Sequence, residues 1–236
     1  MRTLCVVQHT EAEFLGLLED HFESRAVRFH YARPFVPGGA VPRTAEGFDG
    51  LVLLGAAPYG VVSGMLLPSL AAELRLTRDF LARRLPVIGI GAGAVILSVA
   101  AGGGAEESEL EVRMTEAHRI RADALGGMLP ATYPLFLCAR DRAVPPPDAA
   151  ILAHDDAGRP ALFALCGNCL GFSGHPGIKS GMVEDLVLAF DAMPDQSGAA
   201  LEALRVRQGA LAEALSAIMV GVINVTGLMH DDAQPA

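Results

Sequence analysis

The residues that suggest chemistry most directly are three glycines that follow a short apolar strand within residues 85–97. Pro86 can begin a strand without an N–H of its own, and the β-branched residues after it suit a strand buried on both faces. Glycines at positions 89, 91 and 93 permit a sharp bend, and residues 94–101 are predicted to continue as an apolar helix. Many α/β enzymes carry a nucleophile on such an elbow. Here the tip is Gly91, which has no side chain to react.

His175 is the second candidate, in the segment Gly174-His175-Pro176-Gly177 at the end of a predicted strand. A histidine there can serve as a general base, or it can cap and pack the strand end. Without a nucleophile beside it, the imidazole has no proton to take. His9 follows the first predicted strand and is a candidate ligand contact, the alternative being a solvated loop histidine.

Cys166 and Cys169 form a C-x-x-C pair around Gly167-Asn168, which predicts a two-residue hairpin turn. A disulfide across the turn is one interpretation, although redox pairs normally begin a helix. Zinc would need about two further ligands, for which Cys138, His154 and His175 are the candidates. We favour two small buried residues, with no metal site and no cofactor.

Strands alternating with helices must position these residues. The pattern predicts strands at 3–8, 26–31 and 51–54, a helix at 11–23 and an amphipathic helix at 65–84 with Glu73 on its wet face. This order implies a parallel sheet covered by helices, with ligands at the carboxyl ends of its strands. The loops at 8–11, 55–60 and 89–93 should therefore share one edge.

The second half reads as an antiparallel extension. Strands are predicted at 106–117 (mixed charge), 133–144, 151–154, 161–166 and 169–172, and helices at 182–190 and 199–227. The last helix is apolar nearly all round beyond Met219, so we favour a dimer or partner protein covering it over packing on its own sheet. We expect a single domain over residues 1–229 and a disordered tail at 230–236.

The composition narrows the class of function. Apolar residues make up 51% and charged residues 19%, so the chain can bury a sizeable core. A net charge of −9 argues against a nucleic-acid-binding face. Four cysteines are too few for a disulfide scaffold, and no signal peptide or membrane span is predicted. We expect a cytoplasmic protein.

Three segments together resemble the class I glutamine amidotransferases, especially stand-alone relatives of the GMP synthetase glutaminase domain. Residues 48–60 resemble the family's oxyanion loop, residues 86–94 its nucleophile elbow, and residues 171–177 the segment with the catalytic His and Glu. The resemblance covers about residues 1–190 and implies an α/β fold with a mostly parallel central sheet, flanking helices and an antiparallel extension.

The chemistry that the resemblance implies is missing. The family has Cys at the position of Gly91, usually Gln at that of Val95 and Glu at that of Gly177, so only His175 of the triad remains. Residues 138–142 resemble a segment with His and Asp, of which Asp141 matches and Ala139 departs; an exposed ion-pair cluster is the alternative. We therefore expect a catalytically degenerate protein that does not hydrolyse glutamine.

The elbow could still bind a ligand. Backbone N–H groups of Gly91 and Ala92 at the helix N-terminus, with those of Gly55, Ala56 and Ala57 from the neighbouring loop, would suit a small anionic metabolite. The alternative is an elbow filled by water. Gly89-x-Gly91-x-x-Ala94 also fits a dinucleotide fingerprint, but at least the third βα unit is the wrong place for it.

Two hypotheses of function follow. The first is a non-hydrolytic protein that binds a small anionic metabolite or serves as one component of a biosynthetic complex, as a homo-oligomer or hetero-complex through its C-terminal helix. The second is an enzyme of altered chemistry with His175 as general base in the former glutaminase pocket. The sequence does not name the ligand or the pathway.

Overall fold

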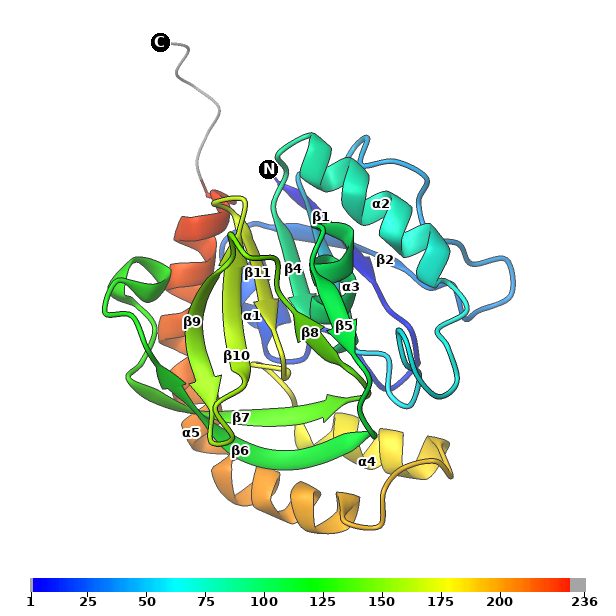
Figure 1. Cartoon of the computed structure of the whole chain (residues 1–236), viewed down its shortest axis with the longest axis vertical. Coiled ribbons are helices and arrows are strands. Elements are labelled where there is room, and N and C mark those ends of the chain that lie inside the picture. Colours follow the sequence, from blue (N-terminus) through cyan, green and yellow to red (C-terminus); the bar gives the residue numbers. More distant parts are fainter. Residues whose placement is uncertain (1, 230–236) are drawn as a thin grey trace.

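A computed structural model describes residues 2–229 of the chain (Figure 1). Its helices and strands alternate in the first half, and strands predominate in the middle, as the sequence predicts. In chain order the elements are β1 (Thr3–Val7), α1 (Leu18–Glu23), β2 (Arg28–Ala32), β3 (Gly50–Leu53), α2 (Leu70–Ala82), β4 (Val87–Ile90), α3 (Ala92–Ala100), β5 (Gly104–Glu106), β6 (Glu111–Arg119), the short 3-10 helix η1 (Ala124–Gly127), β7 (Thr132–Ala139), β8 (Arg142–Val144), β9 (Ala150–Asp155), β10 (Pro160–Leu165), β11 (Cys169–Phe172), α4 (Ser180–Ala189) and α5 (Ser197–Thr226).

One large mixed sheet organises these residues. Its nine strands in the described part of the chain lie in the order β2-β1-β3-β4-β11-β10-β9-β6-β7. The pairings from β2 through to β11 are parallel, and those from β11 through to β7 are antiparallel. The predicted α/β fold, with a mostly parallel sheet and an antiparallel extension, is confirmed. A second small sheet pairs β5 with β8 beside α3.

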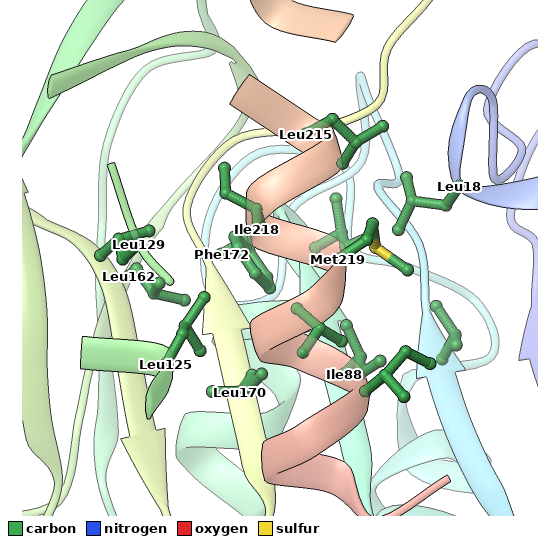
Figure 2. Close-up of a cluster of buried hydrophobic side chains, with 14 of the residues drawn as sticks. Leu18, Ile88, Leu125, Leu129, Leu162, Leu170, Phe172, Leu215, Ile218 and Met219 are labelled. Carbon is green, nitrogen blue, oxygen red and sulfur yellow. The ribbon is translucent and has the colours of Figure 1, made fainter. Parts of the chain in front are cut away.

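The parallel strands are buried on both faces, which explains their continuous runs of apolar residues. Every residue of β3 and β4 is buried. On one face, α2 and α3 cover a cluster that includes Leu76, Phe80 and Ile96. On the other face, α1 and α5 cover a second cluster, in which Phe22 and Met219 pack against the sheet (Figure 2).

Helix α5 closes that second face. Leu215, Ile218 and Met219 point toward Leu170 and Phe172 of β11 in Figure 2. The helix is long and apolar enough to cross a membrane, with a mean hydropathy of 1.6 in its most apolar window, and 44% of that window is buried inside the molecule. The helix also contacts η1, where Gly221 faces Leu125. The chain's own η1 thus supplies a second side of burial that the sequence led us to expect from a partner.

Several predicted boundaries are wrong, each for a tertiary reason. The helix predicted at 11–23 begins only at Leu18 in α1, because Gly16 has a φ of +63° and lies against the Gly177 carbonyl. The strand predicted at 133–144 divides into β7 and β8, because Asp141 has a φ of +64°. The helix predicted at 65–84 starts at Leu70. The disordered tail predicted at 230–236 lies outside the described residues.

Candidate ligand site at the glycine elbow

The elbow keeps the backbone shape that the sequence predicts. Gly91 has φ +56° and ψ −119°, between the end of β4 and the first residue of α3. A Cβ built on Gly91 would lie no nearer than 3.6 Å to any atom beyond its chain neighbours, the closest being the Cys138 carbonyl oxygen and the Gly55 Cα. The site therefore has room for a side chain, although an L residue would be strained at this φ. What the elbow lacks is the reactive group.

The three predicted loops do meet at one edge of the sheet. Gly55 lies beside Gly91, and the buried Ala56 and Ala57 follow it. His9 reaches the same place, because its Nδ1 donates to the Gly55 carbonyl oxygen at 2.7 Å. Ala92 is buried at the start of α3. The structure thus brings together His9, Gly55, Ala56, Ala57, Gly91 and Ala92; their binding of a ligand remains a prediction.

His9 is buried and engaged on both ring nitrogens. Its Nε2 donates to Oε2 of Glu73 at 2.8 Å, and neither side chain is exposed to solvent. Because both nitrogens face acceptors, the ring is an imidazolium. Burial alone would lower the pKa of His9, but the Glu73 carboxylate outweighs burial and raises the pKa. The interpretation as a solvated loop histidine is wrong, and so is the placement of Glu73 on a wet face.

Glu13 occupies the loop where we expected a ligand anion. A Cβ on Gly55 would lie 2.0 Å from Oε1 of Glu13, and the Glu13 carboxyl accepts a hydrogen bond from the Ala57 N–H. Its Oε2 is buried without a hydrogen-bond partner among the described residues. Burial raises the pKa of Glu13 to about 8, against the opposing effect of the His9 charge. A neutral carboxyl of the chain itself therefore fills this part of the oxyanion loop near pH 7.

His175 is held in one neutral form. Its Nε2 donates to the Phe14 carbonyl oxygen at 2.8 Å, and its Nδ1 accepts from the Gly177 N–H at 3.1 Å. Burial lowers the pKa of His175 to about 4. The ring is 6% exposed and does not line the cavity beside Gly91. This arrangement leaves neither ring nitrogen available to accept a proton from a ligand.

Gly177, where the resemblance implies a glutamate, has no room for one. A Cβ there would lie 2.4 Å from Cδ1 of Leu18 and 3.1 Å from its backbone nitrogen. Leu18 is 1% exposed and belongs to the core cluster under α5, so it cannot move aside cheaply (Figure 2). The packing of α1 thus occupies the place of the third triad member.

A cavity of about 100 Å³ opens beside Gly91. Its apolar wall includes Ala94 and Val95 of α3 and Leu137 of β7. Its polar wall carries the hydroxyl of Ser173 and two guanidinium groups, those of Arg142 and Arg159. The cavity is therefore apolar at the elbow and charged at its far side, a lining typical of a small-molecule site.

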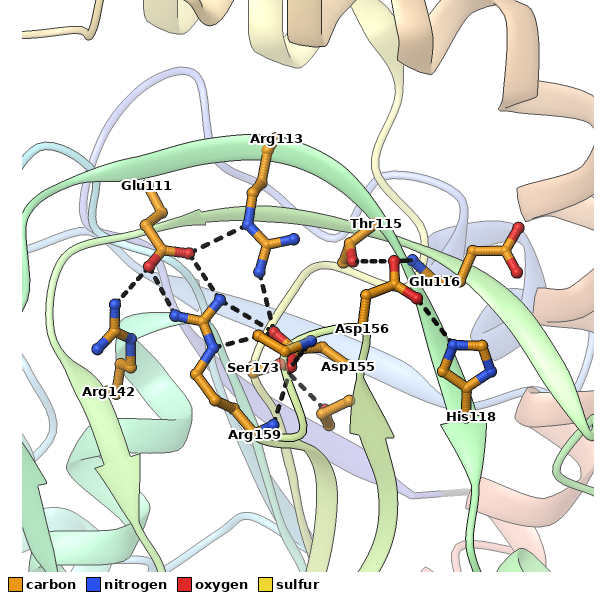
Figure 3. Close-up of polar contacts among 12 residues, drawn as sticks. Glu111, Arg113, Thr115, Glu116, His118, Arg142, Asp155, Asp156, Arg159 and Ser173 are labelled. Carbon is orange, nitrogen blue, oxygen red and sulfur yellow. Dashed lines mark hydrogen bonds and ion pairs between the residues drawn. The ribbon is translucent and has the colours of Figure 1, made fainter.

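Arginines and acids form a paired network along that charged side (Figure 3). Glu111 accepts from Arg142, from Nη1 of Arg159 at 2.7 Å and from Nε of Arg113 at 3.2 Å. Burial alone would raise the pKa of Glu111, but the hydrogen bonds from Arg159 and Arg142 outweigh it and lower the pKa to about 2. Asp155 is paired with Arg113 and Arg159. Nη1 of Arg142 is less engaged, with Glu106 at 3.7 Å.

Asp141 tethers a loop at the cavity's edge. Its Oδ2 accepts from the N–H groups of Val61 and Val62 at 2.7 and 2.8 Å, and its carboxylate also accepts from the Ser63 hydroxyl. The carboxylate is buried, so the alternative of an exposed ion-pair cluster is wrong here. Its role in the structure is to fix the loop at 60–66 against the turn between β7 and β8.

The cysteines offer no replacement nucleophile in this arrangement. Cys138 lies one residue from the cavity wall, but its side chain packs in the cluster with Phe136 and Met182. Burial, with the nearby Glu13 carboxyl group, raises the pKa of Cys138 well above its usual value, so the thiol stays protonated.

The predicted two-residue turn between the C-x-x-C cysteines is wrong. Leu165 pairs with Cys169 across the hairpin, which leaves a three-residue loop with an exposed Cys166 and a buried Cys169. Both cysteines are free thiols. Within residues 2–229, no group of three or more His, Cys, Asp or Glu side chains is placed to hold a metal ion.

Sequence reasoning missed the residues that depend on long-range pairing: Glu13, Glu73, Glu111, Arg142 and Arg159. The mixed charge of the strand predicted at 106–117 is the only local signal for the arginine network. Nothing local marks Glu13, because its partner Ala57 lies on another strand's loop.

Comparisons with solved structures identify the fold. A glutamine amidotransferase from Thermotoga maritima matches at 19% identity and a TM-score of 0.79, covering 95% of this chain and 98% of that one. One from Methylobacillus flagellatus matches at 22% and 0.81, covering 95% of each chain. A GMP synthase-like protein from Thermoplasma acidophilum matches at 16% and 0.59, covering 89% and 98%. No protein-family model and no curated protein matches. The chain has the fold of these glutamine amidotransferases.

Proposed function

We propose that this chain is a catalytically degenerate glutamine amidotransferase-like protein that binds a small anionic metabolite beside Gly91 and does not hydrolyse glutamine. The observation that carries the proposal is the elbow itself. Its backbone has the strained shape that presents a nucleophile, yet Gly91 presents only main chain. The neighbouring cavity is free of that side chain and reaches two arginines, so it suits binding better than covalent chemistry.

The arginines are the groups that would hold the anion. Because Glu13 already accepts from the Ala57 N–H, the oxyanion loop is less suited to a second negative group. Arg142 is the better partner, since its Nη1 has only a distant acidic neighbour in Glu106 at 3.7 Å. A carboxylate or phosphate of the ligand would share Arg142 and Arg159 with Glu111.

Binding tests this proposal directly. The experiment is a thermal-shift screen against amino acids, nucleotides and phosphorylated metabolites, followed by titration calorimetry of any hit. A ligand present at 100 times its Kd should stabilise the fold by about 2.7 kcal/mol. The variant Arg142→Gln should weaken binding of the hit about tenfold. Arg121→Gln is the matched control, because Arg121 is an exposed arginine paired with Asp123 away from the cavity. A hit whose affinity is unchanged in Arg142→Gln would contradict the assigned site.

Membership of a larger complex is supported by a different surface. Leu188 on α4 and Val206 on α5 are 85% and 86% exposed. Helices α4 and α5 pack together, and Arg205 joins Glu184 across them. Light scattering of the purified protein tests this role, with Leu188→Gln/Val206→Gln as the variant. A mass above that of one chain that falls in the double variant supports it, and a monomer in both counts against a homo-oligomer.

The alternative of altered chemistry with His175 as base has weaker support, because both of its ring nitrogens are hydrogen-bonded within the protein. Turnover of any screened ligand that is lost in His175→Ala would favour it.

A further inference from the structure

A second hollow lies away from the elbow cavity and shares none of its lining residues. It is an open groove of about 710 Å³ between the loop at 9–12 and the carboxyl end of α4. Pockets of this size commonly take organic ligands. The groove is therefore large enough for a ligand that the small elbow cavity would exclude.

Three aromatic rings line this groove: Phe35, Tyr59 and Phe190. Tyr59 and Phe190 meet edge to face, with ring centroids 6.5 Å apart and an interplanar angle of 79°. Phe35 is 37% exposed, and Leu188 beside it in the groove is 85% exposed. Apolar side chains gathered in a hollow offer an apolar body of a ligand more contact than scattered surface residues do.

The charges in the groove have one sign. Glu11 and Asp185 line it, and both are exposed without an ion pair among the described residues. His9 also lines the groove, but its charge is compensated by Glu73 at 2.8 Å. No Lys or Arg in residues 2–229 lines it. Arg33, next along the chain to Pro34 and Phe35, is turned to other partners: its Nε donates to Gln8, and its guanidinium lies 4.9 Å from the Tyr31 ring centroid.

A smaller apolar hollow of about 280 Å³ adjoins the groove. The two share His9, Phe35 and Tyr59 in their walls. The rest of the smaller hollow is mainly aliphatic, with Val41, Leu67 and Pro68 among its residues. An apolar portion held there would be connected past Tyr59 to the carboxylates at the other end.

From this arrangement we propose that the groove binds an organic cation, an amine attached to an apolar body, as a small-molecule site separate from the elbow. The ammonium group lies against the rings of Tyr59 and Phe190 and between the carboxylates of Glu11 and Asp185. Cation–π contacts and two carboxylates together favour a positive group over a neutral or negative one. The net charge of −9 attracts such a ligand at long range.

Titration calorimetry at pH 7 and low ionic strength tests the proposal with three probes of one shape: 4-phenylbutylamine, 4-phenylbutanol and 4-phenylbutyrate. We expect the amine to bind at least about tenfold more tightly than the alcohol, and the carboxylate to bind most weakly. Raising the salt concentration should weaken the amine alone. Equal affinity of amine and alcohol would overturn the proposal, as would tighter binding of the carboxylate.

Variants locate the site. Glu11→Gln/Asp185→Asn should weaken the amine about tenfold and change the alcohol less than about twofold. Asp20→Asn/Glu23→Gln removes the same charge from α1 and should leave both affinities unchanged. Tyr59→Leu should weaken the amine more than the alcohol.

Arg142→Gln in the elbow cavity should not affect the amine, so the two sites succeed or fail separately. If the double variant binds the amine as the wild type does, the groove is not the site. A lysine-containing peptide that binds more tightly than the amine would show a polypeptide occupant instead, and would also overturn the proposal.

Discussion

The elbow and the His175 segment have departed from glutaminase chemistry in opposite ways. At the elbow the backbone shape is kept and the reactive group is absent, because Gly91 holds φ +56° with open space around its Cα. At the second segment the reactive residue is kept and its surroundings have changed, because His175 is bonded on both nitrogens and Leu18 fills the place of a residue beyond Gly177. A retained residue therefore says less about activity than the hydrogen bonds around it.

The largest effect we expect comes from Glu13 beside the elbow. Its folded pKa of about 8 lies above the usual value of 4.5, so the folded state holds a proton that the unfolded chain releases. Its contribution to stability is fully present below pH 4.5 and is lost as the pH rises through 8. The raised pKa of His9 acts in the same direction.

We predict that the free energy of unfolding, measured by urea titration, falls by roughly 4 kcal/mol between pH 5 and pH 9 in the wild type. Most of this fall should disappear in Glu13→Gln, which still accepts from the Ala57 N–H. Glu19→Gln on the half-buried face of α1 is the control. An equally steep fall in Glu13→Gln would show that the carboxyl is not buried as the structure has it.

A second prediction sharpens the account of the His175 segment. Gly177→Glu should destabilise the fold by about 3 kcal/mol, because its Cβ would collide with the buried Leu18. Gly181→Glu places the same side chain four residues on, where nothing lies within 4 Å, and should change stability by less than about 0.5 kcal/mol. Urea unfolding of both variants compares them; similar stability for the two would mean that Leu18 does not close this site.

The acid side of the stability profile should report His175. Its folded pKa of about 4 lies below the usual value of 6.5, so the unfolded chain takes up a proton that the folded state refuses. The free energy of unfolding should therefore rise by roughly 3 kcal/mol between pH 4 and pH 6.5. His175→Asn should reduce that rise, whereas the exposed His118→Asn should lose only a small ion-pair contribution with Asp156. Equal slopes in the two variants would contradict a buried neutral ring.

The smallest effect should come from filling the elbow. Gly91→Ala has room for its Cβ, so the cost is the strained φ alone, about 1 to 2 kcal/mol by urea unfolding. Ala92→Ser one residue later, on a buried helical position, controls for general disturbance of α3. A loss above about 4 kcal/mol in Gly91→Ala would mean that the elbow is packed shut and holds no cavity.

The sequence predicts what is local and misses what is assembled from distant parts. The elbow at Gly91 and the long helix α5 follow from glycine spacing and apolar periodicity within one segment. Glu73 has the pattern of a wet-face residue, and only its pairing with His9, 64 residues away, reverses that interpretation. The network around Glu111 likewise joins β6, β8 and the turn before β10, which no local pattern connects (Figure 3).

The most direct test of the central claim is a glutamine hydrolysis assay on the purified protein, with ammonia release measured over a range of glutamine concentrations. We predict release at the rate of the protein-free blank, in the wild type and equally in Gly91→Cys, because His175 and Gly177 cannot complete the reaction. Saturable release by the wild type that disappears in His175→Ala would contradict this account.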